Sequence, residues 1–352
     1  MGCDREIQLL ESLLSGDSKL DITDFEFLLA VKNTDIKKYV FNKACEVAHN
    51  SFGGKVYLRG LVEISNYCRC GCYYCGLRSQ NSKIKRYRLN FDEIINACQR
   101  AYKCGLRTFV LQGGEDLSIS DTFVSSVVST IKEEMPDSAV TLSLGERSFR
   151  SFELFKKAGA DRYLLRHETA SKEHYAFLHP EYMSYSNRIR CLYWLKDLGY
   201  EVGVGMMIGS PGQTLYNLAE DLMFISEFNP EMIGVGPFIP AKDTPFENEI
   251  NGSISLTMYI LSLLRLLCPK SNIPATTALI SLSPDNMQKA IKSGANVIMP
   301  NITPLEQRSN YKIYNGKTDN SLDFIDEIKL IERDLSVIGY EIDWSIGNYK
   351  SV

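Results

Sequence analysis

Several features that would assign a function class are missing from this sequence of 352 residues. Its 39 lysines and arginines are almost balanced by 43 aspartates and glutamates, so the net charge of −4 offers no basic footprint for nucleic acid. No apolar run approaches the roughly 18 residues that a membrane-spanning helix needs. The first ten residues contain no apolar secretory segment, so we expect a cytoplasmic protein whose cysteines stay reduced.

The sequence also lacks any linker, charge block or low-complexity segment, which favours one domain over two. We expect this single domain to span residues 1–352. Within it, a helical cap would cover about 1–54, a core of alternating strands and helices about 55–304, and a short, partly helical tail 305–352.

Short β-branched and aromatic runs alternate with helical stretches from residue 55 onward. Eight such units over about 250 residues predict an α/β fold, a (β/α)8 barrel of TIM type with N-terminal helices and a C-terminal helical extension. A doubly wound open sheet is the alternative. Polar residues or glycines follow seven of the strands, which favours the barrel, because strand ends converge on one face there. The expected strands are 56–65, 107–114, 139–145, 162–168, 201–209, 232–240, 272–278 and 296–302.

Four cysteines, Cys68, Cys70, Cys72 and Cys75, lie together on the loop after the first expected strand. A structural zinc site commonly takes two cysteine pairs separated by a longer gap, and no second pair follows here. A redox site of Cys72 and Cys75 would need no further cysteine. In the third interpretation, Cys68, Cys72 and Cys75 form C-x₃-C-x₂-C and supply three of the four thiolates that an iron–sulfur cubane normally takes. One iron would then stay open to a substrate.

This spacing, with the aromatic Tyr74 before the last cysteine, resembles the radical SAM superfamily. The resemblance implies one [4Fe-4S] cluster held by Cys68, Cys72 and Cys75, with S-adenosylmethionine (SAM) on the open iron. It also implies reductive cleavage of SAM to a 5′-deoxyadenosyl radical. Only this spacing fits the superfamily, so we interpret Cys70 as an incidental loop residue and expect Cys70→Ala to retain the cluster.

Polar residues at the strand ends indicate a ligand site. Gly113 and Gly114 would let a backbone approach a ligand closely. Alternation along a strand places Arg166 and Glu168 on one face and His167 on the other. We therefore expect the charged pair inside the barrel, where it needs a partner or a ligand, and His167 in the packing outside.

Ten segments, from GLVEISNYC (60–68) through DRYLLRHETA (161–170) to GANVIMPN (294–301), resemble the HydE-type maturases of [FeFe]-hydrogenase over roughly residues 50–317. The resemblance implies assembly of the di-iron dithiolate unit of the H-cluster from a small organometallic or amino-acid-derived substrate. It implies other hydrogenase maturases as partners and a flavodoxin or ferredoxin as electron donor. The SAM-binding residues would be Tyr74, Gly113, Gly114, Glu115, Glu168, Arg188 and Met207. The substrate cavity would be lined by Gln112, Thr141, Ser143, Arg166, Thr276, Thr277, Met299 and Tyr314.

One departure from the family stands out. Many relatives carry three more cysteines for a second cluster after a YxxYxGK stretch, and the corresponding segment here, YKIYNGKTDNSLDF (311–324), has none. Methylornithine synthase, another barrel with one cluster, is the nearest alternative, but its equivalent of RHET lacks the arginine and it lacks SLGE. Biotin synthase is disfavoured because no cysteine falls on an expected strand. An iron–sulfur carrier without catalytic activity is the alternative from another class.

Overall fold

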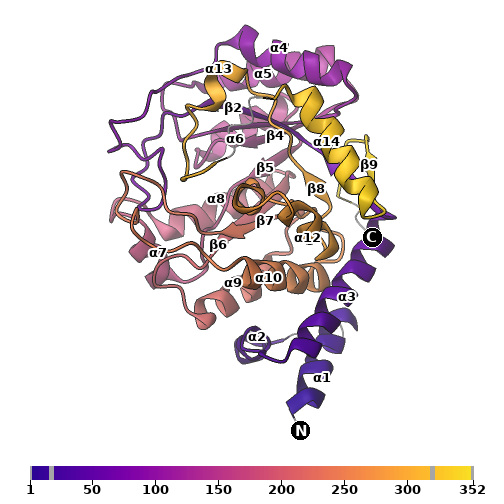
Figure 1. The fold of residues 1–352 in the computed structure, drawn as a ribbon. Coiled ribbons are helices and arrows are strands. Elements are labelled where there is room, and N and C mark those ends of the chain that lie inside the picture. Colours follow the sequence, from indigo (N-terminus) through magenta and orange to yellow (C-terminus); the bar gives the residue numbers. More distant parts are fainter. Residues whose placement is uncertain (1, 16–19, 318–321, 350–352) are drawn as a thin grey trace.

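A parallel sheet forms the centre of the computed structural model, which describes residues 2–15, 20–317 and 322–349. Six strands pair in sequence order, each parallel to the next. They are β2 (Gly60–Ser65), β3 (Thr108–Gly113), β4 (Ala139–Ser143), β5 (Arg162–Leu164), β6 (Glu201–Ile208) and β7 (Met232–Pro237). Helices alternate with these strands along the chain and surround the sheet in Figure 1, as the apolar strand sequences predict.

The sheet closes into a barrel through single bridges and one short strand, β8 (Val297–Ile298). Asn272 bridges to β7, Pro274 bridges to Val297, and Asn301 bridges to Leu61 of β2. The (β/α)8 fold class is therefore confirmed, but the full strand expected at 272–278 is wrong. Pro274 has no N–H to donate, and helix α11 (Thr277–Leu282) already begins three residues later.

The strand expected at 56–65 is split at Arg59 into β1 (Lys55–Leu58) and β2. β1 lies between β8 and a strand that the sequence analysis missed, β9 (Glu341–Asp343), and it is parallel to both. The tail after the barrel therefore contributes a strand as well as helix α14 (Phe324–Val337), which matches the expected tail helix.

Residues 346–349 close the barrel at the end where its strands begin. Arg162, fully buried at the start of β5, donates to the Ile346 carbonyl at 2.9 Å and to Asn348 Oδ1 at 2.6 Å. It also pairs with Glu201 at 2.6 Å. The φ of Gly347 is +59°, and a Cβ added there would lie 2.7 Å from the Tyr57 ring. This end of the barrel is plugged by the chain itself.

The helices begin where the sequence offers caps. Asp21 caps α2, Asn33 caps α3 and Thr214 caps α9, each accepting hydrogen bonds from backbone N–H groups of the first turn. Besides α11 and α14, the helices are α1 (Gly2–Ser15), α2 (Ile22–Leu29), α3 (Thr34–Phe52), α4 (Phe91–Lys103), α5 (Asp121–Glu134), α6 (Phe149–Lys157), α7 (Lys172–Leu178), α8 (Tyr185–Asp197), α9 (Leu215–Phe228), α10 (Ile254–Leu267), α12 (Asn286–Lys292) and α13 (Leu305–Arg308).

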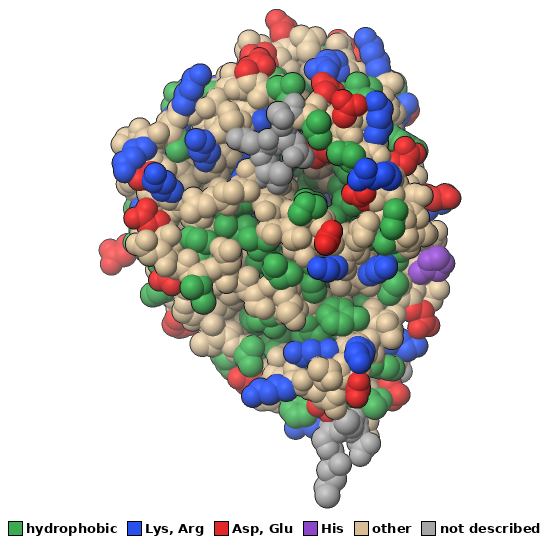
Figure 2. Space-filling model, in the orientation of Figure 1, with side chains coloured by type: hydrophobic (Ala, Val, Ile, Leu, Met, Phe, Trp, Pro, Cys, Tyr) green, Lys and Arg blue, Asp and Glu red, His purple; other side chains and the backbone are tan. Residues whose placement is uncertain are grey.

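Helices α1 to α3 pack beside α9 and α10 at one edge of the barrel, as Figure 1 shows. Within the described ranges, none of the helices combines the length and apolar character that crossing a membrane requires. Figure 2 shows acidic and basic side chains interspersed over the face in view. No large field of one charge covers that face, in keeping with the small net charge.

Candidate active site

The four clustered cysteines lie on the loop of residues 66–90, between β2 and α4. Arg86 holds this loop in shape by donating hydrogen bonds to the carbonyl groups of Asn66, Leu77, Arg78 and Asn81. Gly114, just beyond β3, lies against the loop: a Cβ there would be 2.2 Å from the Tyr67 carbonyl oxygen and 2.7 Å from Cys68 Cβ. The predicted role of Gly114 in close backbone approach thus includes contact with the cysteine loop itself.

Three of the loop thiols are partly buried and the fourth, Cys70, is buried. The Cys70 N–H donates to Cys68 Sγ at 3.4 Å. A hydrogen bond from the Cys70 thiol lowers the pKa of the Cys68 thiol, and the same donor together with His179 lowers the pKa of Cys72 to about 5. Burial raises the pKa of Cys75. Because the thiolate is the metal-binding form, two of the predicted ligands are already favoured as ligands.

The thiols do not converge on one point. Among the residues whose side chains the structure describes, no three His, Cys, Asp or Glu groups lie close enough to share a single metal ion, and the nine cysteines there are free thiols. A cubane offers a separate iron to each cysteine, so three separated thiols on one loop fit such a cluster.

An apolar wall stands beside the loop. Tyr74 and Tyr73 pack against a buried cluster that includes Met207 and Phe238. The Tyr74 hydroxyl is 3.1 Å from His179 Nε2, and the two rings meet edge to face. This wall brings the predicted SAM residues Tyr74 and Met207 together.

Arg188, near the start of α8, is buried among acceptors. Its Nε donates to Glu146 Oε1 at 2.7 Å and its Nη1 to the Arg166 carbonyl at 2.7 Å, while Nη2 lies 3.9 Å from Glu115 Oε1. Glu115 also accepts from Arg69 Nε at 3.0 Å. Two predicted SAM residues, Glu115 and Arg188, therefore meet directly. Glu146 joins them and was absent from the predicted site, although it ends the SLGE segment.

Arg166 and Glu168 form the predicted pair, with the nearest nitrogen and oxygen 3.3 Å apart. Strand β5 ends at Leu164, and Glu168 adopts a left-handed φ of +67°, so the strand expected through 168 is wrong in its length. His167 faces outward as expected. Its Nε2 lies 3.4 Å from Asp221 Oδ1, and its Nδ1 accepts the Gly205 N–H at 3.2 Å.

Polar atoms without partners mark the space next to this pair. Buried atoms that lack a hydrogen bond include Arg166 Nε, Glu168 Oε2, Thr141 Oγ1 and Thr276 Oγ1. A buried polar atom left unpaired costs free energy, and native proteins pair the great majority of such atoms. All four residues were predicted to bind SAM or substrate. Their unpaired atoms fit a polar or anionic ligand, as the predicted cofactor and substrate would be.

A second polar group lies beside them inside the barrel. Glu63, Gln112 and Ser143 are aligned across β2, β3 and β4 by the strand register. Glu63 is fully buried, forms an ion pair with Lys317 and accepts from Asn301 Nδ2 at 3.2 Å. Gln112 Nε2 donates to the Tyr311 hydroxyl at 3.3 Å. Sequence reasoning missed Glu63, Asn301, Tyr311 and Lys317. The signal that could have identified this group was Glu63, a charged residue within the otherwise uncharged strand GLVEIS.

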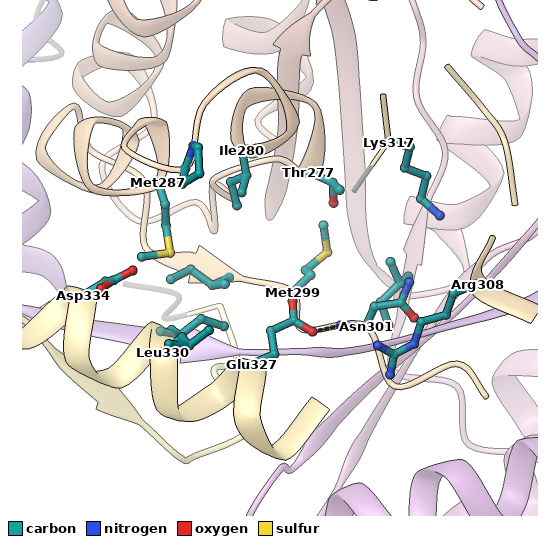
Figure 3. A pocket seen from close by; sticks show the side chains of 14 residues that line it. Thr277, Ile280, Met287, Met299, Asn301, Arg308, Lys317, Glu327, Leu330 and Asp334 are labelled. Carbon is teal, nitrogen blue, oxygen red and sulfur yellow. Dashed lines mark hydrogen bonds between the residues drawn. The ribbon is translucent and has the colours of Figure 1, made fainter. Parts of the chain in front are cut away.

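Thr277 and Met299 lie apart from Arg166, at a cavity of about 150 Å³ between the barrel and α14. Figure 3 shows both side chains at this cavity with Asn301, from the same segment as Met299, and with Lys317 and Glu327 from two further segments. Because Asn301 and Lys317 also contact Glu63, the cavity adjoins the polar interior. The hydroxyl of Tyr314 is buried and has a hydrogen bond with Ser281.

Known proteins resemble this chain in sequence and in fold. The profile of the radical SAM superfamily matches residues 62–225. The chain is 45% identical over 289 residues to the [FeFe] hydrogenase maturase subunit HydE of Thermotoga maritima, which covers 82% of each chain. It is 29% identical over 346 residues to 3-methylornithine synthase of Methanosarcina barkeri, covering 96% of this chain and 95% of that protein. The crystal structure of methylornithine synthase aligns with a TM-score of 0.81 at 25% identity, over 95% of this chain and 97% of the other.

The match to the Thermotoga protein is both close and extensive. The superfamily match begins within β2, runs through the cysteine loop and includes Glu115, Arg166 and Glu168. Proteins of this superfamily work with a [4Fe-4S] cluster and SAM. The chain belongs to the HydE-type maturases of the radical SAM superfamily and is an enzyme of that type.

Proposed function

We propose that this enzyme acts in the assembly of the di-iron dithiolate unit of the [FeFe]-hydrogenase H-cluster. The observation that carries the proposal is the set of unpaired buried atoms at Arg166, Glu168, Thr141 and Thr276, in a chain so similar to a HydE maturase. These atoms are arranged for a ligand with both positive and negative groups. The substrate we propose is small, and is either organometallic or derived from an amino acid.

Cys68, Cys72 and Cys75 would hold the cluster, with no protein ligand on the fourth iron. When bound, the cluster supplies the electron that cleaves the SAM sulfonium to a 5′-deoxyadenosyl radical. The Glu168 carboxylate, whose Oε2 has no hydrogen bond and lies 3.3 Å from Arg166 Nη2, would accept the SAM ammonium. Arg188 would contribute positive charge toward the SAM carboxylate from its fixed position among Glu146, Glu115 and the Arg166 carbonyl.

Other residues would complete the SAM site. The apolar wall of Tyr74 and Met207 suits the adenine ring, because flat aromatic ligands pack on such surfaces. Gly113 and Gly114, at the end of β3, would offer backbone groups close to the amino-acid end of SAM. Glu115 would act by holding Arg188 and Arg69 in place.

The barrel interior would bind the substrate. The Arg166 guanidinium and the hydroxyls of Thr141, Ser143 and Thr276 would bind an anionic or carboxylate group. Gln112 and Tyr314 would line the far wall, and Thr277 and Met299 the side cavity. A buried interior also keeps water and bulk reductant away from a reactive radical. We propose other hydrogenase maturases and a flavodoxin or ferredoxin as partners, in the cytoplasm.

A maturation assay tests the pathway. Lysate that contains the other maturases but lacks this protein would be supplied with wild-type protein or with Cys72→Ala, and hydrogenase activity would be measured. We expect activity with wild type only. An inactive wild type that instead isomerises an amino acid would contradict the proposal.

Methylornithine synthase chemistry is the second candidate, because the relative from Methanosarcina barkeri aligns over 96% of this chain. That enzyme type would act on an amino acid without any hydrogenase partner. A non-catalytic iron–sulfur carrier differs from both. Anaerobic incubation with SAM and dithionite separates it, because a carrier would form no 5′-deoxyadenosine.

A further inference from the structure

The outer surface beside the cysteine loop is hollowed into a groove. Two adjoining cavities share Arg69, Glu115, Glu146 and Asn187 in their linings. One extends toward Arg147 and Trp194, the other toward Tyr182 and Arg190. The groove is therefore built by the cysteine loop, the segment after β3, the start of α6 and α8. It lies outside the barrel and is distinct from the interior where Thr141 and Thr276 lie.

Among the four loop cysteines, Cys70 is the one that lines this groove. Its N–H donates to Cys68 Sγ at 3.4 Å, and it lies two residues from both Cys68 and Cys72 along the loop. One residue thus separates the groove from two of the three proposed cluster ligands. A redox partner that occupied the groove would approach the cluster more closely there than through the helices around the barrel.

The rim of the groove combines exposed apolar side chains with cations. Leu117 is 72% exposed, Tyr182 62% and Phe149 41%. Phe149 meets Trp194 edge to face, and the guanidinium of Arg190 lies 5.0 Å from the centre of the Trp194 ring. These contacts join α6 and α8 into one continuous surface. Exposed aromatic and aliphatic groups of this kind are typical of a protein-binding surface.

Charge on the rim is unbalanced toward positive. Arg190 lines the groove, and Arg150 follows Phe149 in the first turn of α6. Both are exposed and neither takes part in an ion pair among the residues that the structure describes, although Arg190 donates to Asn187 Oδ1. Arg69 is half exposed at the groove while it pairs with Glu115. The other acid of the groove lining, Glu146, pairs with Arg188. Two unpaired guanidinium groups on a protein of net charge −4 would attract a partner with an acidic surface and repel basic ones.

We propose that this surface, named here the Arg150–Arg190 rim, docks a small acidic one-electron carrier protein of the flavodoxin or ferredoxin class. The inference rests on the proposed function, because reductive cleavage of SAM requires one electron for each cleavage. The reduced cofactor of the docked carrier would give up one electron to a cluster held by Cys68, Cys72 and Cys75. That electron would be consumed when the carbon–sulfur bond of the sulfonium breaks to give methionine and the 5′-deoxyadenosyl radical.

The test compares two reductants on the same enzyme. The double variant Arg150→Glu/Arg190→Glu is reconstituted with its cluster, and formation of 5′-deoxyadenosine is followed with dithionite or with reduced flavodoxin or ferredoxin at increasing concentration. We expect an unchanged rate with dithionite and a carrier KM raised about tenfold or more at low salt. The difference from wild type should shrink as salt is added.

Two further variants keep the result specific. Lys38→Glu, an exposed charge change on α3 away from the loop, should leave the carrier KM unchanged. Leu117→Ser should raise it by a smaller factor that salt does not alter, because an apolar contact is lost.

Other outcomes overturn the inference. A carrier KM within twofold of wild type in the double variant contradicts it, and so does an equal loss with dithionite. The inference is also contradicted if the wild-type enzyme responds to dithionite but is reduced by neither flavodoxin nor ferredoxin. Absence of 5′-deoxyadenosine from wild type with dithionite would instead contradict the proposed function.

Discussion

Two arginines of the same barrel segment differ in how fully the chain pairs them. Arg162, where β5 begins, is fully buried and donates to Ile346, Asn348 and Glu201. Arg166, four residues later at the opposite end, has two nitrogens with no hydrogen bond and a single carboxylate partner 3.3 Å away. The chain itself provides every strong acceptor at the closed end. At the open end it leaves acceptors to be provided by a ligand.

The contrast extends to the neighbours of each arginine. At the closed end, Thr108 Oγ1 donates to the Ile346 carbonyl at 2.9 Å, whereas Thr276 Oγ1 at the open end has no partner. Arg59 is an exception at the closed end, since its Nε is unpaired and burial lowers its pKa. The atoms of Arg166, Glu168 and Thr276 without a hydrogen bond mark the end of the barrel where we place the chemistry.

The largest effect is expected at the cysteine loop. Cys68→Ala and Cys72→Ala each remove one of three proposed ligands, and we expect loss of the four-iron cluster and of SAM cleavage. Cys70→Ala should keep the cluster, because the C-x₃-C-x₂-C spacing is intact. Iron and sulfide content with the cluster absorption band measures the outcome. Equal iron loss from Cys70→Ala and Cys68→Ala would show that Cys70 is a ligand.

Exchange of each arginine for methionine tests the two ends directly. Arg162→Met should lower the free energy of unfolding by about 3 kcal/mol, because the acceptors of residues 346–348 and Glu201 lose their buried donor. Arg166→Met should change it by less than about 1 kcal/mol, since it removes few contacts. Chemical denaturation gives both values.

The same pair should behave oppositely in function. Arg166→Met should abolish substrate conversion while SAM cleavage continues, and Arg162→Met should retain conversion at temperatures where it stays folded. Similar losses of stability in the two variants would remove the distinction between the two ends.

A smaller effect is expected at the plug. Gly347→Ala places a methyl group 2.7 Å from the Tyr57 ring at a φ of +59°, and we expect about 2 kcal/mol of destabilisation. Gly339→Ala is the matched control, because its φ is +79° and its added Cβ would meet nothing within 4 Å. Thermal unfolding of both variants separates the clash from the backbone strain. Equal melting temperatures would mean that residues 346–349 do not press on β1.

Local patterns predicted most of the barrel. Strands β3, β4, β6 and β7 lie inside their expected ranges, because nearly continuous apolar runs with β-branched residues are encoded locally. The segment at 272–278 failed because only pairing partners decide whether a proline-containing run becomes a strand. β9 was missed because three residues with no apolar run form a strand only beside β1.

The candidate site was likewise predicted only where local sequence patterns decide the structure. Alternation correctly turned Arg166 inward and His167 outward, although Glu168 reaches the interior through a left-handed residue and not through strand geometry. Contacts between segments distant in the sequence could not be predicted from such patterns. The ion pair of Glu63 with Lys317 joins residues 254 positions apart, and no spacing rule connects them.

The ion pair of Glu63 with Lys317 gives the smallest expected effect on stability. It refines the comparison of the two barrel ends, because Glu63 lies in the open half and yet has a partner within the chain. Burial raises its pKa from 4.5, although Lys317 and Asn301 act in the opposite direction. A carboxyl with a raised folded-state pKa favours folding below the unfolded-state value, and this contribution is lost as pH rises through the folded-state value. The free energy of unfolding of wild type relative to Glu63→Gln should therefore fall by about 1.4 kcal/mol per pH unit within that window and be flat above it.

Denaturation of both proteins from pH 4 upward measures this slope, with the exposed Glu133→Gln as control. A relative stability that instead rises with pH would mean that Lys317 dominates Glu63, so that the open half holds a preformed ion pair as firmly as the closed end holds Arg162.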